Sequence, residues 1–442
     1  AWRSTDDAVL VACATGELVT LPSAGGAATS SVVVRRDLRD VLVVGGQVVV
    51  STFRSAQLLW VAADGTVTQT LALPSNDGGD ARVAWRTIAD ASGNLVVVHQ
   101  LQSIEEIDTT QPSSYGGGGS SIVQTGVSTV SPDGEILNDT LVPSAVLPVD
   151  EALSPDGSTL YVAAAGNAAT QSLASIVAAP VLGGFNPGSL GGQLPSGQVT
   201  AVAFDAAGDA LAFVREPAAL WIERAGEGGF VPVSFGAVSR DDTGHDVFHT
   251  QAGALIACAS CHPEGGDDGH IWDLDGNERR TPSLRGTIVG TAPYHWPGDM
   301  KDLDALVDQV YVQRMSGTQL DPGQMNVLEG WVQSIPAPPA PSWVDTAAAA
   351  RGQALFEGDQ AGCSVCHSGD KLTNNMTVSV GTGGAFQVPP LVGVGWRTPL
   401  LHDGCAISVA DRFGRCATPG HGSTAGLSTQ NVSDLVAYLD SL

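Results

Sequence analysis

The sequence predicts a multidomain chain, in which an all-β repeat region is followed by two smaller, mainly α domains. A length of 442 residues exceeds one ordinary core, since a domain usually takes about 100–200 residues. The 54 glycines suit a turn-rich region more than a helical one. Every histidine except His99, and every methionine, lies after residue 240. The predicted parts are 1–240, 241–335, a proline-rich linker at 336–344, and 345–442.

Charge and hydropathy exclude several classes of protein. Lys and Arg number 20 against 46 Asp and Glu, giving a formal charge of −26. Such a chain repels nucleic acid and anionic membranes, so a basic protein partner or a small molecule fits better. A hydrophobic fraction of 43% argues against disorder, and no apolar run is long enough to cross a bilayer.

The first part repeats short strands between glycine turns. Strand-length apolar runs such as 48–50 and 95–98 follow turns in which Asp or Ser precedes Gly. The spacing approaches the 40–45 residues of a propeller blade and marks about five units. These units lie near 5–36, 38–75, 80–143, 147–186 and 197–236. Residues 153–167 resemble the YVTN type of β-propeller repeat. Degenerate units could raise the count, and a pair of β-sandwiches remains the alternative.

Little chemistry is visible in this region. We interpret His99 as a structural side chain on a strand and Cys13 as a small buried hydrophobe. The third unit is stretched by an insertion at 109–120, which contains four consecutive glycines and is expected to be a mobile loop.

Two C-x-x-C-H pentapeptides dominate the rest of the chain. The first is Cys258, Cys261 and His262, and the second is Cys363, Cys366 and His367. Two thiols three positions apart can form thioethers with one porphyrin, and the following His then ligates its iron. A zinc knuckle or a redox C-x-x-C is the alternative, which two copies of the full pentapeptide disfavour. The motifs therefore predict two covalently bound haem c groups.

Haem c attachment takes place outside the cytoplasm, so we expect a periplasmic or extracellular protein whose signal peptide has been removed. In that compartment Cys405 and Cys416 are a plausible disulfide, and two free thiols are the alternative.

The surroundings of the two motifs resemble each other. Each motif is followed by a proline-containing segment, at 281–298 and at 388–404, and then by a closing helical pattern, at 327–335 and 432–442. This parallel predicts two class-I-like cytochrome c folds. The proline-rich stretch between them should be semi-rigid.

Residues 245–442 resemble the di-haem cytochrome c peroxidase and MauG superfamily. The resemblance is carried by both pentapeptides, by 281–299, and by 397–404 with 427–442. It implies a haem propionate near Arg285, with Arg397 as the substitute in the second copy, which lacks the equivalent Arg. It also implies a hydrogen-bonding role for His402 and a possible calcium ion between the haem domains, whose ligands the sequence does not identify.

The sixth iron ligands decide between electron transfer and peroxide chemistry. Met315 and His421 lie at equivalent distances before the two closing helices, which favours them as axial ligands of the first and second haem. Tyr311, one helical turn before Met315, is its rival in the MauG-like branch. Other candidates for the first haem are Met300, His270 and His295. Core packing for Met315 and a surface loop for His421 are the alternatives.

Two functions stay open on this basis. Electron transfer by two low-spin haems, with the propeller as a docking or scaffold module, is the working hypothesis. A di-haem peroxidase or MauG-like oxidase with one high-spin haem is the alternative. An acid–base group would then be needed, and Glu264, His270 and Tyr311 are weak candidates. Residues 263–269, which include Asp267 and Asp268, could equally form a solvated polar loop.

Overall fold

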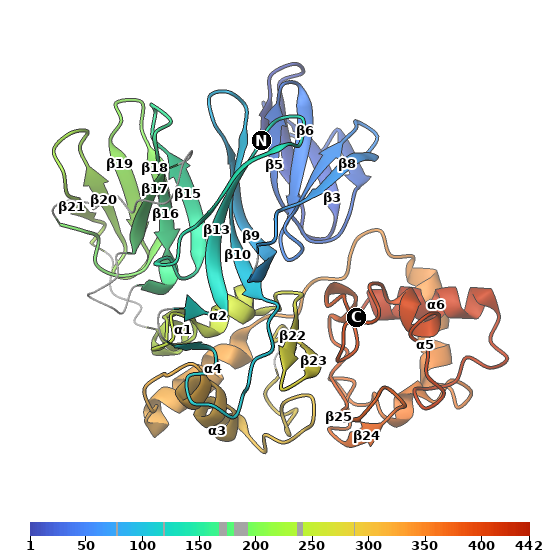
Figure 1. The fold of residues 1–442 in the computed structure, drawn as a ribbon. Helices are drawn as coiled ribbons and strands as arrows, with labels where there is room; N and C mark the ends of the chain where they lie inside the picture. Colours follow the sequence, from blue (N-terminus) through green and yellow to red (C-terminus); the bar gives the residue numbers. More distant parts are fainter. Residues whose placement is uncertain (77, 118–119, 168–174, 181–192, 237–241, 287) are drawn as a thin grey trace. The chain divides into compact units, whose positions relative to one another are not determined.

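A computed structural model describes the chain from residue 1 to 442, except for residues 77, 118–119, 168–174, 181–192, 237–241 and 287 (Figure 1). Contacts divide it into two compact units. The first comprises residues 1–105, 111–261 and 314–318, and the second comprises 106–110, 262–313 and 319–442. Segment 106–110 therefore belongs to the second unit although the residues on either side belong to the first. Segment 314–318 belongs to the first unit although its neighbours in sequence belong to the second.

Five antiparallel sheets, each formed by strands in chain order, make up most of the first unit. Their strands are β1 (Trp2–Arg3), β2 (Ala8–Ala12), β3 (Glu17–Pro22), β4 (Ser30–Val33); β5 (Leu38–Val44), β6 (Gln47–Thr52), β7 (Gln57–Val61), β8 (Val67–Ala72); β9 (Gly79–Ala89), β10 (Leu95–Ser103), β13 (Val123–Val130), β14 (Ile136–Leu141); β15 (Pro148–Leu153), β16 (Thr159–Ala164), β17 (Ile176–Pro180); and β18 (Val199–Phe204), β19 (Ala210–Val214), β20 (Ala219–Glu223), β21 (Val231–Ser234). These sheets coincide with the five predicted repeat units.

The predicted turns join these strands. Gly65, Gly134, Gly157 and Gly208 all have a positive φ, between 72° and 87°, which only glycine adopts without strain. Successive sheets contact one another through β2 and β5, β5 and β9, β9 and β15, and β15 and β18. This order is that of a propeller-like fan (Figure 1).

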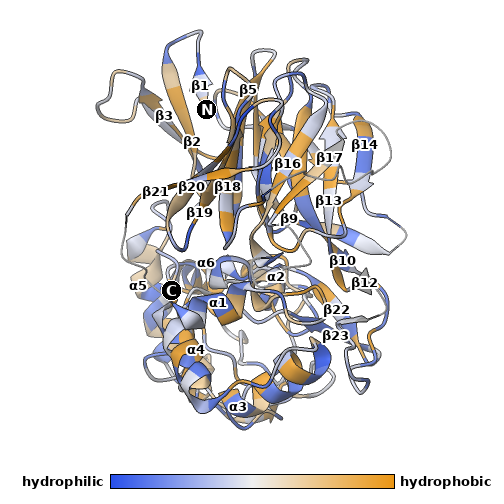
Figure 2. Cartoon of the chain, turned by 90° about the vertical axis from the view of Figure 1, so that its left-hand side faces the viewer, coloured by the Kyte–Doolittle hydropathy of each residue, from blue (hydrophilic) through white to orange (hydrophobic). Residues whose placement is uncertain are grey.

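Apolar cores fill the space between successive sheets. Leu10 and Leu18 pack with Val50 and Leu59 between the first and second sheets. Ile176 and Trp221 belong to the core between the fourth and fifth sheets. Apolar residues accordingly colour strands such as β2 and β16 (Figure 2). Because one face of each sheet is buried against the next sheet, apolar and polar side chains alternate along these strands.

His99 is fully buried in β10, where its Nε2 lies 2.8 Å from the Ser128 hydroxyl, as its structural interpretation requires. Cys13 is only half-buried rather than buried, because it follows the end of β2 at the margin of the first sheet.

The insertion in the third sheet carries specific hydrogen bonds where a mobile loop was predicted. Its strands β11 (Gly116–Gly117) and β12 (Ser120–Ser121) pair with each other. The backbone N–H of Tyr115 donates to the Arg314 carbonyl at 3.0 Å. Gly118 and Gly119 lie outside the described residues.

The C-terminal part contains short helices, two small hairpins and long irregular segments. Its helices are α1 (Thr243–His249), α2 (Cys258–Cys261), η2 (Pro263–Gly265), α3 (Leu303–Leu306), η3 (Val307–Arg314), α4 (Pro322–Ser334), α5 (Thr346–Glu357), η4 (Cys363–Val365), η5 (Val394–Trp396), η6 (Ala410–Phe413) and α6 (Thr429–Asp440). The hairpins are β22 (Ile271–Leu274) with β23 (Asn277–Arg280), and β24 (Thr377–Ser379) with β25 (Ala385–Gln387). A short helix η1 (Ala165–Asn167) belongs to the sheet region. The two predicted closing helices correspond to α4 and α6.

Helices α5 and α6 cross closely in the second unit. At the crossing, a Cβ on Gly352 would lie 1.9 Å from the Asp434 carbonyl oxygen, so no larger residue fits. The Arg351 guanidinium donates two hydrogen bonds to the Asp434 carboxylate, at 2.7 and 2.9 Å. Phe356, Leu435 and Tyr438 fill the core beside this crossing.

Candidate haem-binding sites

The second pentapeptide lies just after α5. Cys363 and Cys366 lie at the two ends of the η4 turn, and neither forms a disulfide. The Nδ1–H of His367 donates a hydrogen bond of 3.0 Å to the Leu372 carbonyl. This bond leaves Nε2 as the nitrogen available to a metal, the usual arrangement of a ligating histidine.

His421 faces the same imidazole. The ring centres of His367 and His421 lie 6.3 Å apart, and the ring planes are inclined by 33°. Metal–imidazole bonds of about 2.0–2.1 Å would place two trans imidazole centres roughly 6 Å apart. Burial, with contributions from Arg412 and His367, lowers the pKa of His421 to about 3. A neutral imidazole is the form that binds metals.

A buried cation lies in the second unit at a place that suits a haem propionate. Arg397 is 7% exposed and donates to the Pro390 and Arg285 carbonyls, at 2.7 and 3.1 Å. Its Nε makes no hydrogen bond to any described residue. Burial lowers the pKa of this guanidinium to about 10. An anionic group that accepts from Nε would therefore fit here, as the chemistry of a haem propionate requires.

Arg285, the residue that the resemblance placed near a propionate, is more exposed. Its guanidinium lies 3.3 Å from the Glu264 carboxylate, and both side chains are partly accessible to solvent. Glu264 is therefore engaged in a surface ion pair. Neither residue has the buried position of Arg397.

The first pentapeptide begins in α2, which holds Cys258 and Cys261. Burial raises the pKa of Cys258 to about 12. The next residue, His262, has its Nδ1 3.2 Å from the Gly266 carbonyl. The same carbonyl partnership that orients His367 thus orients His262.

Met315 is a buried thioether, with 3% of the residue exposed. Its carbonyl accepts a hydrogen bond of 3.0 Å from the N–H of Ala254, four positions before Cys258 in the sequence. Tyr311 is half-buried in η3, which is a π-helix. The prediction that Tyr311 precedes Met315 by one α-helical turn is wrong, because π-helical turns are wider and Met315 lies beyond the helix end.

The acidic segment after the first pentapeptide is buried, so a solvated loop is the wrong interpretation for most of it. Asp267, Asp268 and His270 are each at most 3% exposed, whereas Glu264 is exposed. The Arg280 guanidinium lies 3.2 Å from the Asp267 carboxylate. Desolvation raises the pKa of Asp268 to about 7. Sequence reasoning missed Arg280, which is the last residue of β23 and carries no motif of its own.

Aromatic side chains meet within the second unit. The Trp296 and His402 ring centres are 6.2 Å apart, and His402 stacks on Phe386 at 4.0 Å. The structure gives the His402 ring aromatic contacts with Phe386 and Trp296, and its hydrogen-bonding role stays a prediction. Its carbonyl accepts from the Arg280 N–H at 2.7 Å. Trp296 therefore touches a residue of the second cytochrome-like region.

A disulfide joins Cys405 and Cys416, which are separated by 11 positions. Among the described residues, no group of three or more His, Cys, Asp or Glu side chains could hold a metal ion, so no calcium site is assigned. Of the helices that the structure describes, none is long and apolar enough to span a membrane.

Comparison with known proteins supports the second haem motif directly. The cytochrome c family model matches residues 349–442. The gamma subunit of hydrazine synthase from Kuenenia stuttgartiensis is 26% identical over 42% of this chain and 72% of that protein.

Similar solved structures are distant. A hydrazine synthase structure from the same organism is 21% identical, covers 47% of this chain and 89% of that chain, and has a TM-score of 0.40. A MauG-like protein associated with microbial copper homeostasis is 17% identical over 48% of this chain and 91% of that chain, with a TM-score of 0.36. The matched family and the cysteine–histidine geometry agree: residues 349–442 form a cytochrome c domain, and a domain of this family implies covalently bound haem c.

Proposed function

We propose that this protein is an extracytoplasmic di-haem c-type cytochrome that transfers electrons. The observation that carries the proposal is the facing pair His367 and His421, whose ring centres are separated by 6.3 Å. Two imidazoles so placed would hold the second haem iron from both sides and leave no position for peroxide. The haem supplies the iron that accepts and passes on one electron.

The first haem would be held by Cys258, Cys261 and His262, with Met315 as its distal ligand. The buried thioether of Met315 and its backbone contact beside α2 favour this assignment over Tyr311. A His–Met pair raises the potential of a haem above that of a His–His pair. The two haems would therefore differ in potential, and the first would be the better electron acceptor.

Arg397 would bind a propionate, and its buried charge would stabilise the carboxylate. The contacts between the two haem-motif regions support transfer from one to the other. Gln387 donates to the Thr291 carbonyl at 3.1 Å, and Asn375 donates to the Gly290 carbonyl at 3.2 Å. Both bonds lie within the second unit and join residues that follow the first pentapeptide to residues that follow the second.

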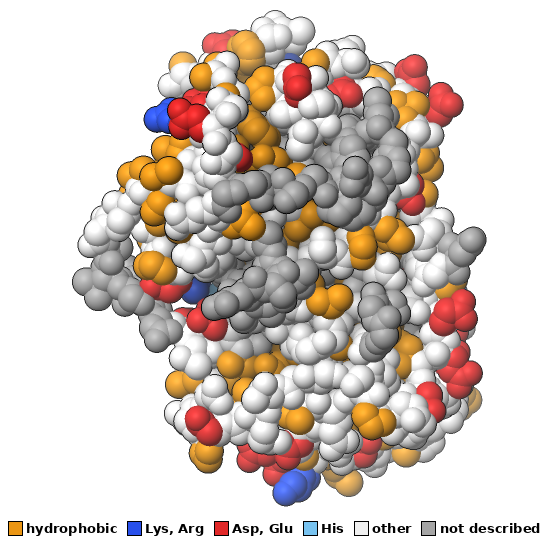
Figure 3. Space-filling model, turned by 60° about the vertical axis from the view of Figure 1, so that its left-hand side comes forward, with side chains coloured by type: hydrophobic (Ala, Val, Ile, Leu, Met, Phe, Trp, Pro, Cys, Tyr) orange, Lys and Arg blue, Asp and Glu red, His pale blue; other side chains and the backbone are white. Residues whose placement is uncertain are grey.

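The five-sheet region would dock or scaffold a basic redox protein. On the face shown in Figure 3, acidic side chains form several groups near the margin, with few basic ones among them, in keeping with a formal charge of −26. The last sheet also exposes apolar residues: Phe213 is 38%, Val233 47% and Phe235 56% exposed. An apolar contact area in an acidic surface suits a partner whose own apolar patch is ringed by Lys or Arg.

EPR of the oxidised protein tests the electron-transfer assignment. Two low-spin ferric signals that peroxide leaves unchanged are expected. A substantial high-spin signal would contradict the proposal and favour the di-haem peroxidase or MauG-like alternative. In the variant His421→Ala, the low-spin signal of the second haem should convert to high spin, while the first haem keeps its signal. His295→Ala, which removes an imidazole already bonded to Asp299 at 3.1 Å, is the matched control.

The charge of the partner can be tested separately. The rate of electron transfer to small basic redox proteins should fall as ionic strength rises, since screening shortens the range of attraction to about 10 Å at 0.1 M. Stopped-flow measurements with a basic and an acidic acceptor would show the difference. A rate that is independent of salt with both acceptors contradicts a basic partner.

A further inference from the structure

The segment that carries Met315 is held from one side by the insertion of the third sheet. We propose that Ser113 and Tyr115 are positioning residues, which fix the Met315 thioether for the iron of the first haem. The inference rests on the proposed function, in which Met315 is the distal ligand. It adds that a loop of the sheet region, whose contacts span 199 and 203 positions in sequence, controls this ligand.

Three contacts join the insertion to the residues on either side of Met315. The Tyr115 N–H donates to the Arg314 carbonyl at 3.0 Å. The Arg314 guanidinium donates back to the Tyr115 hydroxyl at 3.2 Å and lies 5.8 Å from the centre of its ring. The Ser316 hydroxyl donates to the Ser113 hydroxyl at 2.5 Å. Both neighbours of Met315 are thus bonded to the same short loop.

The backbone at this contact is strained. Ser316 has a φ of +58° and Ser113 a φ of +59°, although neither is Gly, Asn or Asp. A left-handed non-glycine residue of this kind is unfavourable and persists only where surrounding contacts determine it. Here the two left-handed serines stabilise each other through their hydroxyls. The conformation directly after Met315 therefore depends on Ser113.

The opposite side of the segment packs on the approach to α2. The Gly253 N–H donates to the Ser316 carbonyl at 3.2 Å, and the Ala254 N–H donates to the Met315 carbonyl at 3.0 Å. A Cβ on Gly253 would lie 2.5 Å from the Ser316 carbonyl oxygen, so the two backbones touch. Residues 314–316 are therefore fixed between the insertion and the residues that lead to Cys258.

Positioning matters for this ligand in particular. Methionine is unbranched and has three rotatable side-chain bonds, so its sulfur does not stay in place without a fixed backbone and packing. With the backbone of 314–316 bonded on both sides, only the side-chain torsions of Met315 remain, and burial restricts these.

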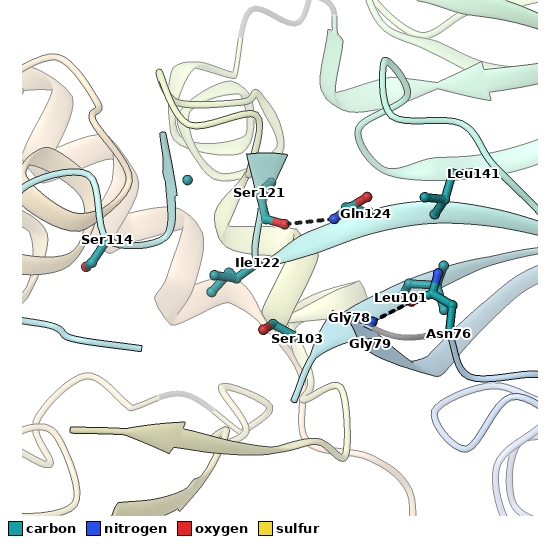
Figure 4. Close-up of a pocket in the computed structure, with 11 residues that line it drawn as sticks. Asn76, Gly78, Gly79, Leu101, Ser103, Ser114, Ser121, Ile122, Gln124 and Leu141 are labelled. Atoms are coloured by element: carbon teal, nitrogen blue, oxygen red, sulfur yellow. Dashed lines mark hydrogen bonds between the residues drawn. The ribbon is translucent and has the colours of Figure 1, made fainter. Parts of the chain in front are cut away.

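The same insertion offers a matched control. Ser114 lies between the two positioning residues but lines a cavity of about 620 Å³ on the third sheet, together with residues such as Leu101, Ser121 and Gln124 (Figure 4). Its hydroxyl makes no hydrogen bond to any described residue. Ser114→Ala removes one serine hydroxyl from the loop, as Ser113→Ala does, but it leaves the contacts to Arg314 and Ser316 intact.

The experiment compares the full-length holoprotein variants Ser113→Ala, Tyr115→Phe and their combination with Ser114→Ala. The readouts are the sulfur-to-iron charge-transfer band of a Met-ligated ferric haem and the reduction potentials of both haems. In the double variant we expect loss of most of the band and a lower potential of the first haem, with the second potential unchanged. Ser114→Ala should match the unmodified protein. The single variants, which each remove one hydroxyl, keep the test available if the double variant does not fold.

Met315→Leu separates the two levels of the argument. If this variant retains the band, Met315 is not the ligand, and both the assignment and the positioning role fail. If Met315→Leu loses the band but Ser113→Ala and Tyr115→Phe keep it, the positioning role alone is wrong. Equal losses in Ser114→Ala and in the positioning variants would also overturn it, because general loosening of the loop would then be the cause.

Discussion

The two loops that follow the haem motifs share a backbone but differ in their side chains. Residues 293–300 and 399–406 each contain a left-handed non-glycine residue, His295 with a φ of +74° and Leu401 with a φ of +71°. Each loop is closed by a β-bridge, between Tyr294 and Met300 in one and between Leu400 and Ala406 in the other. The position after the left-handed residue is Trp296 in the first loop and His402 in the second. The two loops therefore share a backbone conformation but carry different side chains.

The axial ligands differ in how they are supported. His421 is held by residues of its own domain. Its N–H donates to the Thr418 carbonyl at 3.2 Å, and the Thr418 hydroxyl donates to the Val380 carbonyl. The Met315 segment instead takes its contacts from Ser113, Tyr115 and Gly253, which belong to the first compact unit. One proposed ligand is therefore self-supported and the other is supported by distant sequence. The following changes test that contrast.

The largest effect is expected from the haem-attachment cysteines. Cys363→Ser with Cys366→Ser should remove covalent haem from the second site, and Cys258→Ser with Cys261→Ser from the first, because serine forms no thioether. Intact-mass measurement should show one haem lost in each double variant and both lost in the quadruple variant. An unchanged mass in either double variant contradicts a two-haem protein.

A large loss of stability is expected at the α5–α6 crossing. Gly352→Ala would force a methyl group against the Asp434 carbonyl, at a cost of about 3 kcal/mol or more. Denaturant unfolding followed by the absorbance of the second haem would measure it. Gly330→Ala in α4 is the matched control, because nothing lies within 4 Å of its added Cβ. That substitution should stabilise α4 by up to about 1 kcal/mol. Equal effects at both glycines would contradict the close crossing.

A smaller loss is expected from the disulfide of the second domain. Its loop of 11 positions predicts a stabilisation of about 2–3 kcal/mol through the unfolded chain. Replacing Cys405 and Cys416 by Ala should lower the unfolding free energy by that amount without altering the spectrum of the first haem. Cys13→Ala, at a half-buried free thiol, should change it by less than about 0.5 kcal/mol. If the disulfide variant also loses less than about 0.5 kcal/mol of unfolding free energy, the disulfide has no structural role.

Much of this organisation is predictable from sequence because it is local. The five sheets follow from glycine turns at regular spacing, and the cysteine–histidine pentapeptides are short motifs with one strong interpretation. The parallel between Met315 and His421 before the two closing helices pointed to His421, whose ring centre lies 6.3 Å from that of His367; its ligation of iron stays a prediction. By contrast, the burial of Asp267 and Arg280, and the contact of Ser113 with Ser316, depend on packing between segments far apart in the chain. Such contacts have no signature in composition or period.

The left-handed pair of serines also bears on how such a protein could be assembled from modules. A boundary near residue 240, which the repeat pattern favours, would separate residues 314–316 from residues 113–115. A recombination event or an expression fragment cut there would keep both haem-attachment motifs intact, yet would lose the support of one ligand turn. Exchange of the sheet region for another repeat array would then preserve function only if the incoming array brought an equivalent insertion. The contact therefore makes the conformation of residues 314–316 depend on residues 113–115.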